Sequence, residues 1–144
     1  ANTAAAHDRD GKPRNRPGAT PIMAARYGAA GGLSTSAPEY AKFLIEVIDP
    51  KPSDAFRLTR SSRDEMIRPQ VKVDASSSWA LGWQIQHHPK GDLIAHGGDN
   101  PGFKASVLAS VARRSGYVIL TNGDSGGEVI GKLTDGDLNA FVTG

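Results

Sequence analysis

The chain has 144 residues, the length of one ordinary domain, and its 38% hydrophobic content is enough for a lean core. The net charge of +2 comes from scattered basic residues with no interleaved aromatic residues, which excludes a dedicated nucleic-acid surface. The absence of cysteine excludes disulfides and cysteine-based metal sites, and no apolar stretch is long enough to span a membrane.

The first half predicts one loop-rich region followed by two helices. Residues 1–35 are rich in Pro, Gly and charge without periodicity, which predicts an extended loop region. Ser36 and Glu39 then form a capping box that begins a helix, and Pro50 ends it. The expected buried stripe of this helix is Ala41, Leu44, Ile45 and Ile48. A shorter helix is expected from about Ser61 to Ile67, before Pro69.

The second half predicts four strands and a final helix. The strands are WALGWQIQHH at 79–88, DLIAHGG at 92–98, FKASVLASVA at 103–112 and YVILTN at 117–122. Short turns between them favour an antiparallel meander, and the continuous apolar run at 117–122 predicts a central strand. After Asn122 the pattern is helical, although Gly131 and Gly136 weaken or break it. Helices before and after an antiparallel sheet predict the α+β class.

The string GDSGG at 123–127 is similar to the serine region of chymotrypsin-type proteases, in which Ser125 would be the nucleophile and His7 its base. Only 17 residues follow Gly127, too few for the rest of a second barrel. The favoured interpretation is local: Asn122, Asp124 and Ser125 are N-cap residues of the last helix, and the glycines make the tight turn.

A second string carries more chemical information. In LIAHGGDNPGF, residues 93–103, His96-Gly97-Gly98 ends a strand before a Pro-Gly turn. This resembles the third motif of the penicillin-recognising serine hydrolases, the superfamily of serine β-lactamases, DD-peptidases and related esterases. Similar stretches of that superfamily follow in the right order: HDRDGKP at 7–13, AAGGLSTSAPEYAKF at 29–43, LGW at 81–83 and GYVILTN at 116–122.

The resemblance implies specific roles for the residues at this strand end. His96 would act beside the nucleophile as a cation or hydrogen-bond donor, or would orient a substrate carboxylate. Gly97 and Gly98 let a substrate backbone approach closely, and the Asp99 N–H would donate to the oxyanion. We therefore expect His96, Gly98 and Asp99 to be catalytic and Gly97 and Asn100 to bind substrate. The alternative for His96 is a strand histidine that caps a carbonyl.

A further histidine pair, His87-His88, could indicate a metal site. Adjacent strand residues point to opposite faces, however, so a solvated hairpin end is favoured. We expect no metal and no cofactor.

The nucleophile motif of the superfamily, Ser-x-x-Lys, is absent, as is Tyr-x-Asn or Ser-x-Asn. We therefore interpret residues 1–144 as one C-terminal segment of a β-lactamase-like domain, loop-rich at 1–35, helical at 36–70, with the sheet and last helix at 71–144. It would be inactive alone, and its partners would be an acyl substrate and the N-terminal part of the same enzyme, with no nucleic acid and no membrane. The resemblance also implies a location outside the bacterial cytoplasm.

Two questions stay open. Gly97 offers no hydroxyl for an antibiotic carboxylate, which favours an esterase-like or D-amino-acid peptidase-like relative over a true β-lactamase. The alternative to an enzyme part is a non-catalytic binding or structural domain with the same fold.

Overall fold

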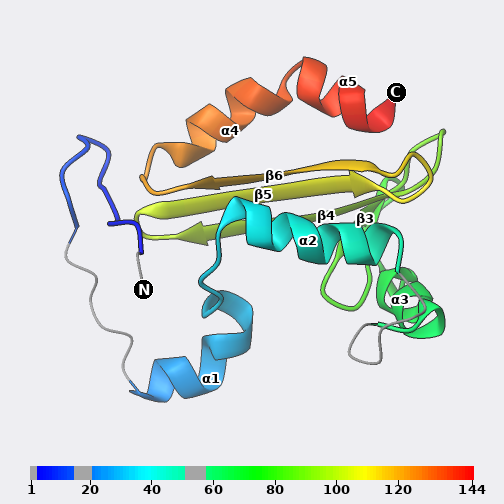
Figure 1. Ribbon diagram of the computed structural model, residues 1–144, viewed down its shortest axis with the longest axis horizontal. Coiled ribbons are helices and arrows are strands. Elements are labelled where there is room, and N and C mark those ends of the chain that lie inside the picture. The colour runs from blue at the N-terminus through cyan, green and yellow to red at the C-terminus, as the bar shows by residue number, and fades with distance from the viewer. Residues whose placement is uncertain (1–2, 15–20, 51–57) are drawn as a thin grey trace.

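The computed structural model describes residues 3–14, 21–50 and 58–144. Its centre is a six-stranded antiparallel sheet in the order β1-β2-β3-β4-β5-β6, with α2 against one face and α4 and α5 against the other (Figure 1). The helices are α1 (Pro21–Gly31), α2 (Ala37–Ile48), α3 (Arg60–Ile67), α4 (Gly126–Thr134) and α5 (Asp137–Thr143). The strands are β1 (Val71–Lys72), β2 (Ser77–Trp79), β3 (Gln84–Gln86), β4 (Leu93–Asn100), β5 (Phe103–Ser110) and β6 (Ser115–Thr121). The predicted α+β class is confirmed.

Helix α2 begins where its sequence predicts. Ser36 is the N-cap, and its side chain accepts a hydrogen bond from the Glu39 N–H at 3.4 Å. The predicted stripe is partly wrong, because Ile45 is 59% exposed and Val47 is buried instead. The sheet therefore contacts the narrower stripe of Leu44, Val47 and Ile48 at i, i+3 and i+4.

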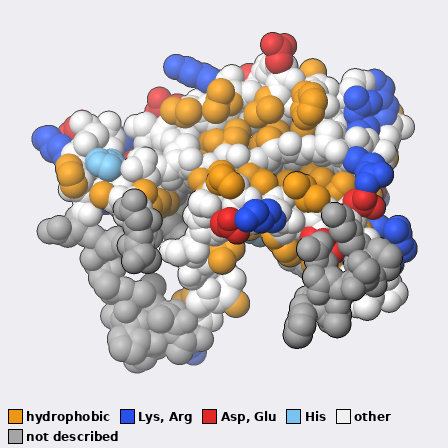
Figure 2. Space-filling view, viewed as in Figure 1, with side chains coloured by type: hydrophobic (Ala, Val, Ile, Leu, Met, Phe, Trp, Pro, Cys, Tyr) orange, Lys and Arg blue, Asp and Glu red, His pale blue; other side chains and the backbone are white. Residues whose placement is uncertain are grey.

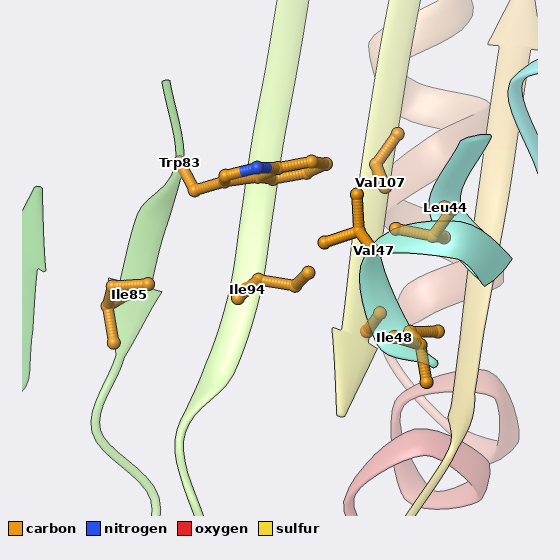
Figure 3. Close-up of a cluster of buried hydrophobic side chains, with 8 residues drawn as sticks. Leu44, Val47, Ile48, Trp83, Ile85, Ile94 and Val107 are labelled. Carbon is orange, nitrogen blue, oxygen red and sulfur yellow. The ribbon is translucent and has the colours of Figure 1, made fainter. Parts of the chain in front are cut away.

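The larger core lies between α2 and the sheet (Figure 3). Its buried members are Leu44, Val47, Ile48, Trp83, Ile85, Ile94, Val107 and Ala109. Each large aliphatic side chain in it contributes about 1.5–3 kcal/mol of burial free energy. A smaller core on the opposite face joins Leu93, Ala95 and Leu108 to Val142 of α5. The sheet is thus held from both sides.

Two predicted segments differ from the structure. The extended loop expected over 1–35 is wrong for 21–31, which form α1. Pro21 suits the first turn of a helix, and the alanines favour helix strongly, yet without an apolar stripe the periodicity gives no signal. The single strand expected over 79–88 is also wrong. The chain reverses through Gly82, whose φ is +84°, so β2 and β3 form a hairpin.

The position of YVILTN is a third difference. We predicted a central strand, but β6 lies at the end of the sheet, with no strand beyond it among the described residues. Its apolar run arises because α2 packs on one of its faces and α5 on the other. The final helix breaks near Gly136, as expected, which separates α4 from α5. No helix in the described ranges is long and apolar enough to cross a bilayer.

Candidate active site

The outer edge of β4 is open over the second half of the strand. β5 pairs with β4 along its whole length, from Leu93↔Ser110 to Asn100↔Phe103. β3 pairs only with Leu93–Ala95. From His96 to Asn100 the other edge therefore has no strand beside it in the part of the chain that the structure describes. Such an edge presents backbone N–H and C=O groups to which an extended ligand can hydrogen-bond.

The His96-Gly97-Gly98 motif lies on this open edge, and all three residues are exposed. His96 Nδ1 is 2.7 Å from the Gly97 carbonyl oxygen, so Nδ1 carries a proton and donates it. In the neutral ring Nε2 is then left as an acceptor. The Trp79 ring stands edge-on to the His96 ring, with centroids 6.1 Å apart. The alternative for His96 was a strand histidine that caps a carbonyl, and its ring does hydrogen-bond a carbonyl. That carbonyl belongs to the next residue, however, and His96 stays exposed to solvent.

The two residues that follow are fixed by a lysine that the sequence reasoning missed. Lys104 Nζ is 2.5 Å from the Asp99 carboxylate and 3.4 Å from the Asn100 carbonyl oxygen. Its side chain is only 16% exposed. Lys104 faces Asp99 directly across the β4–β5 ladder, so a hairpin register could have found this pair.

The end of β4 also approaches the second stretch that carried the family resemblance. The Asn100 Oδ1 atom lies 3.8 Å from the position that a Cβ atom on residue 31 would occupy, so the two residues are close together. Gly31 is the last residue of α1 and belongs to the AAGGL stretch. The fold thus brings together two segments that are about seventy positions apart in the chain, at the end of the open edge.

A hollow of about 200 Å³ adjoins His96 and Gly97. It is lined by Gln84, Gln86, Ala95, His96, Gly97, Ser106, Val107, Leu108, Tyr117 and Asn139. Apart from the histidine, these are neutral side chains, several of them hydrogen-bonding amides and hydroxyls. The motif is therefore at the surface beside a concavity, and not inside a closed core.

The GDSGG turn has a different role from the one predicted. Ser125 occupies the N-cap position of α4, but its side chain makes no capping hydrogen bond. Asp124 instead accepts a hydrogen bond from the Gly102 N–H at 2.7 Å and pairs with Arg14 Nη2 at 2.5 Å. Asn122 Nδ2 donates to the Ala5 carbonyl at 3.0 Å. The predicted N-cap roles of Asn122 and Asp124 are thus wrong, because both side chains reach other segments of the chain.

The protease interpretation requires a His–Ser hydrogen bond at this turn. His7 does lie beside it, but its Nδ1 is 3.1 Å from the Asn122 carbonyl oxygen. Within the described residues the ring makes no hydrogen bond to Ser125. Asp124 is also committed elsewhere: the bond from the Gly102 N–H, with the nearby charges of Arg14 and Lys104, holds its pKa below the usual range. The geometry is that of a structural junction.

A second cluster has the hydrogen-bond order of a serine-hydrolase triad. The Ser78 hydroxyl is 2.9 Å from His87 Nε2, and His87 Nδ1 is 3.2 Å from the Asp92 carboxylate. Nδ1–H faces the carboxylate, so Nε2 accepts the Ser78 proton. Ser78 is only 4% exposed within β2, however, which leaves no approach for a substrate carbonyl. The cluster therefore clasps β2 to the β3–β4 hairpin.

His87 and His88 were expected at a solvated hairpin end, and the two side chains make different contacts there. His87 joins the clasp, while the neighbouring His88 accepts a hydrogen bond from the Lys90 N–H at 3.2 Å. No group of three His, Cys, Asp or Glu side chains in the described ranges is placed to hold a metal ion.

The sequence matches a known protein family. The family model described as Beta-lactamase matches residues 1–139. No curated protein matches the sequence. The family match covers nearly the whole chain, from the N-terminal segment through β4 and into α5, and confirms the resemblance that the motifs indicated. The chain belongs to the β-lactamase family.

Proposed function

We propose that this chain is the C-terminal segment of a β-lactamase-related serine hydrolase and forms one wall of its active site. The reaction would be acyl transfer on ester, D-amino-acid amide or β-lactam substrates. Membership of the family supports a hydrolase of this general type. The observation that carries the proposal is the exposed His96-Gly97-Gly98 motif on the edge of β4 that β3 leaves free.

The proposed mechanism needs a serine from outside this chain, because no Ser-x-x-Lys occurs in it. The serine oxygen bonds to the substrate carbonyl carbon, and the leaving group departs with a proton. Water then cleaves the resulting serine ester. The Asp99 N–H would donate to the oxyanion, and Lys104 holds the Asp99 side chain at 2.5 Å. His96 would donate from a protonated ring, or accept through Nε2, next to the reacting groups.

The motif itself favours some substrates over others. Gly97 provides no hydroxyl to bind the carboxylate of a β-lactam, and Asn100 offers a neutral amide. We therefore expect turnover of a p-nitrophenyl ester or a D-alanyl amide to exceed turnover of a chromogenic cephalosporin. Preference for the cephalosporin would contradict this part of the proposal.

Exposed apolar side chains support a partner segment. Figure 2 shows hydrophobic side chains gathered along α2 and along α4–α5. Phe43 and Ile45 on α2 are 43% and 59% exposed, and Phe141 on α5 is 62% exposed. Apolar patches of this kind commonly mark contact with another protein surface. The partner that fits the missing chemistry is the nucleophile-bearing part of the same enzyme.

The test is covalent labelling. The chain alone, treated with a fluorescent penicillin and with a fluorophosphonate, should form no adduct. The chain produced together with the polypeptide encoded upstream of Ala1 should give an adduct on a serine of that polypeptide. In that assembly His96→Ala should lower turnover of the p-nitrophenyl ester. An adduct on a serine within residues 1–144 would contradict the proposal.

A non-catalytic binding or structural domain is the second candidate, and the missing Ser-x-x-Lys favours it. Sedimentation separates the two. A well-behaved monomer that neither associates with the upstream polypeptide nor supports labelling would indicate the independent domain. Association with that polypeptide would indicate the enzyme.

A further inference from the structure

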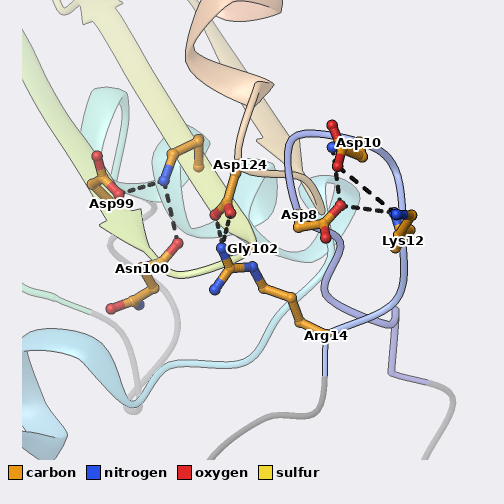
Figure 4. A network of polar contacts seen from close by, with 9 residues as sticks. Asp8, Asp10, Lys12, Arg14, Asp99, Asn100, Gly102 and Asp124 are labelled. Atoms are coloured by element: carbon orange, nitrogen blue, oxygen red, sulfur yellow. Dashed lines mark hydrogen bonds and ion pairs between the residues drawn. The ribbon is translucent and has the colours of Figure 1, made fainter.

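We propose that Asp124 and Arg14 form a positioning pair for the end of β4, and so for the Asp99 N–H. This inference rests on the proposed function, since it concerns the same wall of the active site. Neither residue touches the open edge itself. Both act through the turn that follows β4, where three segments of the chain converge (Figure 4).

The turn after β4 needs an outside restraint. Asn100 pairs with Phe103, so the loop consists of Pro101 and Gly102 alone. Gly102 has a φ of +76°, and proline followed by a residue with positive φ is the pattern of a type II turn. Type II turns match the right-handed twist of hairpin strands poorly. A hairpin with such a turn is prone to splay at its tip unless another group holds it.

Asp124 supplies that restraint. Its carboxylate accepts the Gly102 N–H at 2.7 Å and lies 2.5 Å from Arg14 Nη2. The Asp124 side chain is 13% exposed, so water competes little for its bond to Gly102, whereas the Arg14 side chain is 45% exposed. Lys104, whose charge is also near Asp124, holds the Asp99 carboxylate. The tip of β4 is therefore held by two charge-assisted contacts, one at Gly102 and one at Asp99.

Arg14 is delivered by an ordered strap, residues 5–14, that lies over the turn. The His7 N–H donates to the Asn122 carbonyl, and the Asp124 N–H donates to the His7 carbonyl, each at 3.0 Å. The Arg14 N–H donates to the Ala6 carbonyl at 2.7 Å. Asp8 organises the loop between them, since its carboxylate accepts the N–H groups of residues 10 and 12, each at 2.9 Å.

The kinetic consequence follows from where Gly102 lies. It is three residues beyond Asp99, so movement of the turn displaces the proposed oxyanion donor. A misplaced donor weakens binding of the transition state more than binding of the ground state. Loss of the pair should therefore lower kcat while KM changes little.

The experiment compares Asp124→Ala, Asp124→Asn and Arg14→Gln with a control, Asp10→Asn. Asp10 belongs to the same strap, but its 4.0 Å pair with Lys12 is exposed and far less constrained. Hydrogen exchange of the backbone amides of residues 98–100, 102 and 103 in this chain should rise roughly tenfold to a hundredfold in Asp124→Ala, the loss expected for one hydrogen bond to a charged group. Arg14→Gln should give a smaller rise, and Arg14→Lys and the control should stay near wild type.

The second measurement is steady-state turnover of a p-nitrophenyl ester by the assembled hydrolase. Asp124→Ala should reduce kcat several-fold more than it changes KM, and Arg14→Lys should restore most of the loss seen in Arg14→Gln. If Asp124→Ala does not fold, Asp124→Asn and Arg14→Gln carry the test.

Two results would overturn the inference. Unchanged exchange at residues 98–103 shows that the pair does not hold the tip. Raised exchange with unchanged kcat shows that the tip does not position the donor, and in that case the proposed function still stands if His96→Ala lowers turnover.

Discussion

Substitution of Gly102 by alanine tests whether the strap really lies over the β4–β5 turn. Gly102 combines a φ of +76° with a close neighbour, because an added Cβ would lie 2.5 Å from the Ala6 Cβ. The left-handed backbone costs an alanine about 1–2 kcal/mol. Displacing the packed strap adds roughly 1–3 kcal/mol, the usual cost of overpacking. The alanine also restricts the unfolded chain, which returns about 0.4–1 kcal/mol, so we expect a net loss of roughly 1–5 kcal/mol, centred near 3.

Gly11 provides a matched control within the same molecule. Its φ is +77°, nearly that of Gly102, but an added Cβ would meet no atom within 4 Å. Gly11→Ala should therefore cost only roughly 1 kcal/mol, from backbone strain alone. Urea denaturation followed by circular dichroism gives both values. Equal losses for the two variants would refute the reasoning, because the steric contact between the strap and the turn would then have no energetic effect.

Four other substitutions have expected outcomes. Ser78→Ala should lower the free energy of unfolding by about 1 kcal/mol in urea denaturation, through loss of the hydrogen bond to His87, and fluorophosphonate should not label Ser78 in the native chain; a labelled Ser78 would mean that the clasp opens. The pKa of Asp124 is lower in the folded chain than its ordinary 3.8, so its contribution to stability is complete well above that value and is lost as the pH falls through the lower folded pKa. The difference in unfolding free energy between wild type and Asp124→Asn should accordingly shrink when denaturation is repeated below pH 3.8; a constant difference would exclude the charged form as its source. His96→Ala should leave the melting temperature of the chain unchanged, since the ring is exposed, and Ser125→Ala should leave turnover by the assembled hydrolase unchanged; loss of turnover in Ser125→Ala would restore the protease interpretation.

Local signals predicted the elements whose stability is local. The capping box at Ser36 and Glu39 fixed the start of α2, because one side chain satisfies a backbone N–H three residues away. β5 was recognisable from the period-2 pattern of its apolar residues, and β4 from the short turns on either side of it. The end of α4 near Gly136 was visible for the same kind of reason, since glycine weakens a helix wherever it stands.

Elements defined by tertiary contacts were harder to predict. β3 is three residues long, and Gly82 is the only turn signal between it and β2. From the sequence alone the two strands therefore look like one continuous strand. The apolar run of β6 has the same appearance whether strands or helices cover it. The Lys104–Asp99 contact and the Ser78–His87 hydrogen bond both depend on strand register, which the sequence does not show directly. The residues of the candidate site stay a prediction from the sequence, whereas the groups that hold the end of β4 in place were found only in the structure.

The GDSGG string shows why this division matters. Its glycines make the tight turn that their letters predict, and its serine stands at the N-cap position of α4 without making the capping hydrogen bond. Its aspartate does something that no window of the sequence contains, because its partners are Gly102, 22 positions away, and Arg14 in the N-terminal strap. A short string fixes backbone conformation well, since conformation depends on neighbours in the chain. It predicts the partners of a charged side chain poorly, because a carboxylate in a packed junction pairs with whichever donors the fold brings to it. The same five letters can therefore hold a nucleophile in one fold and a strand tip in another.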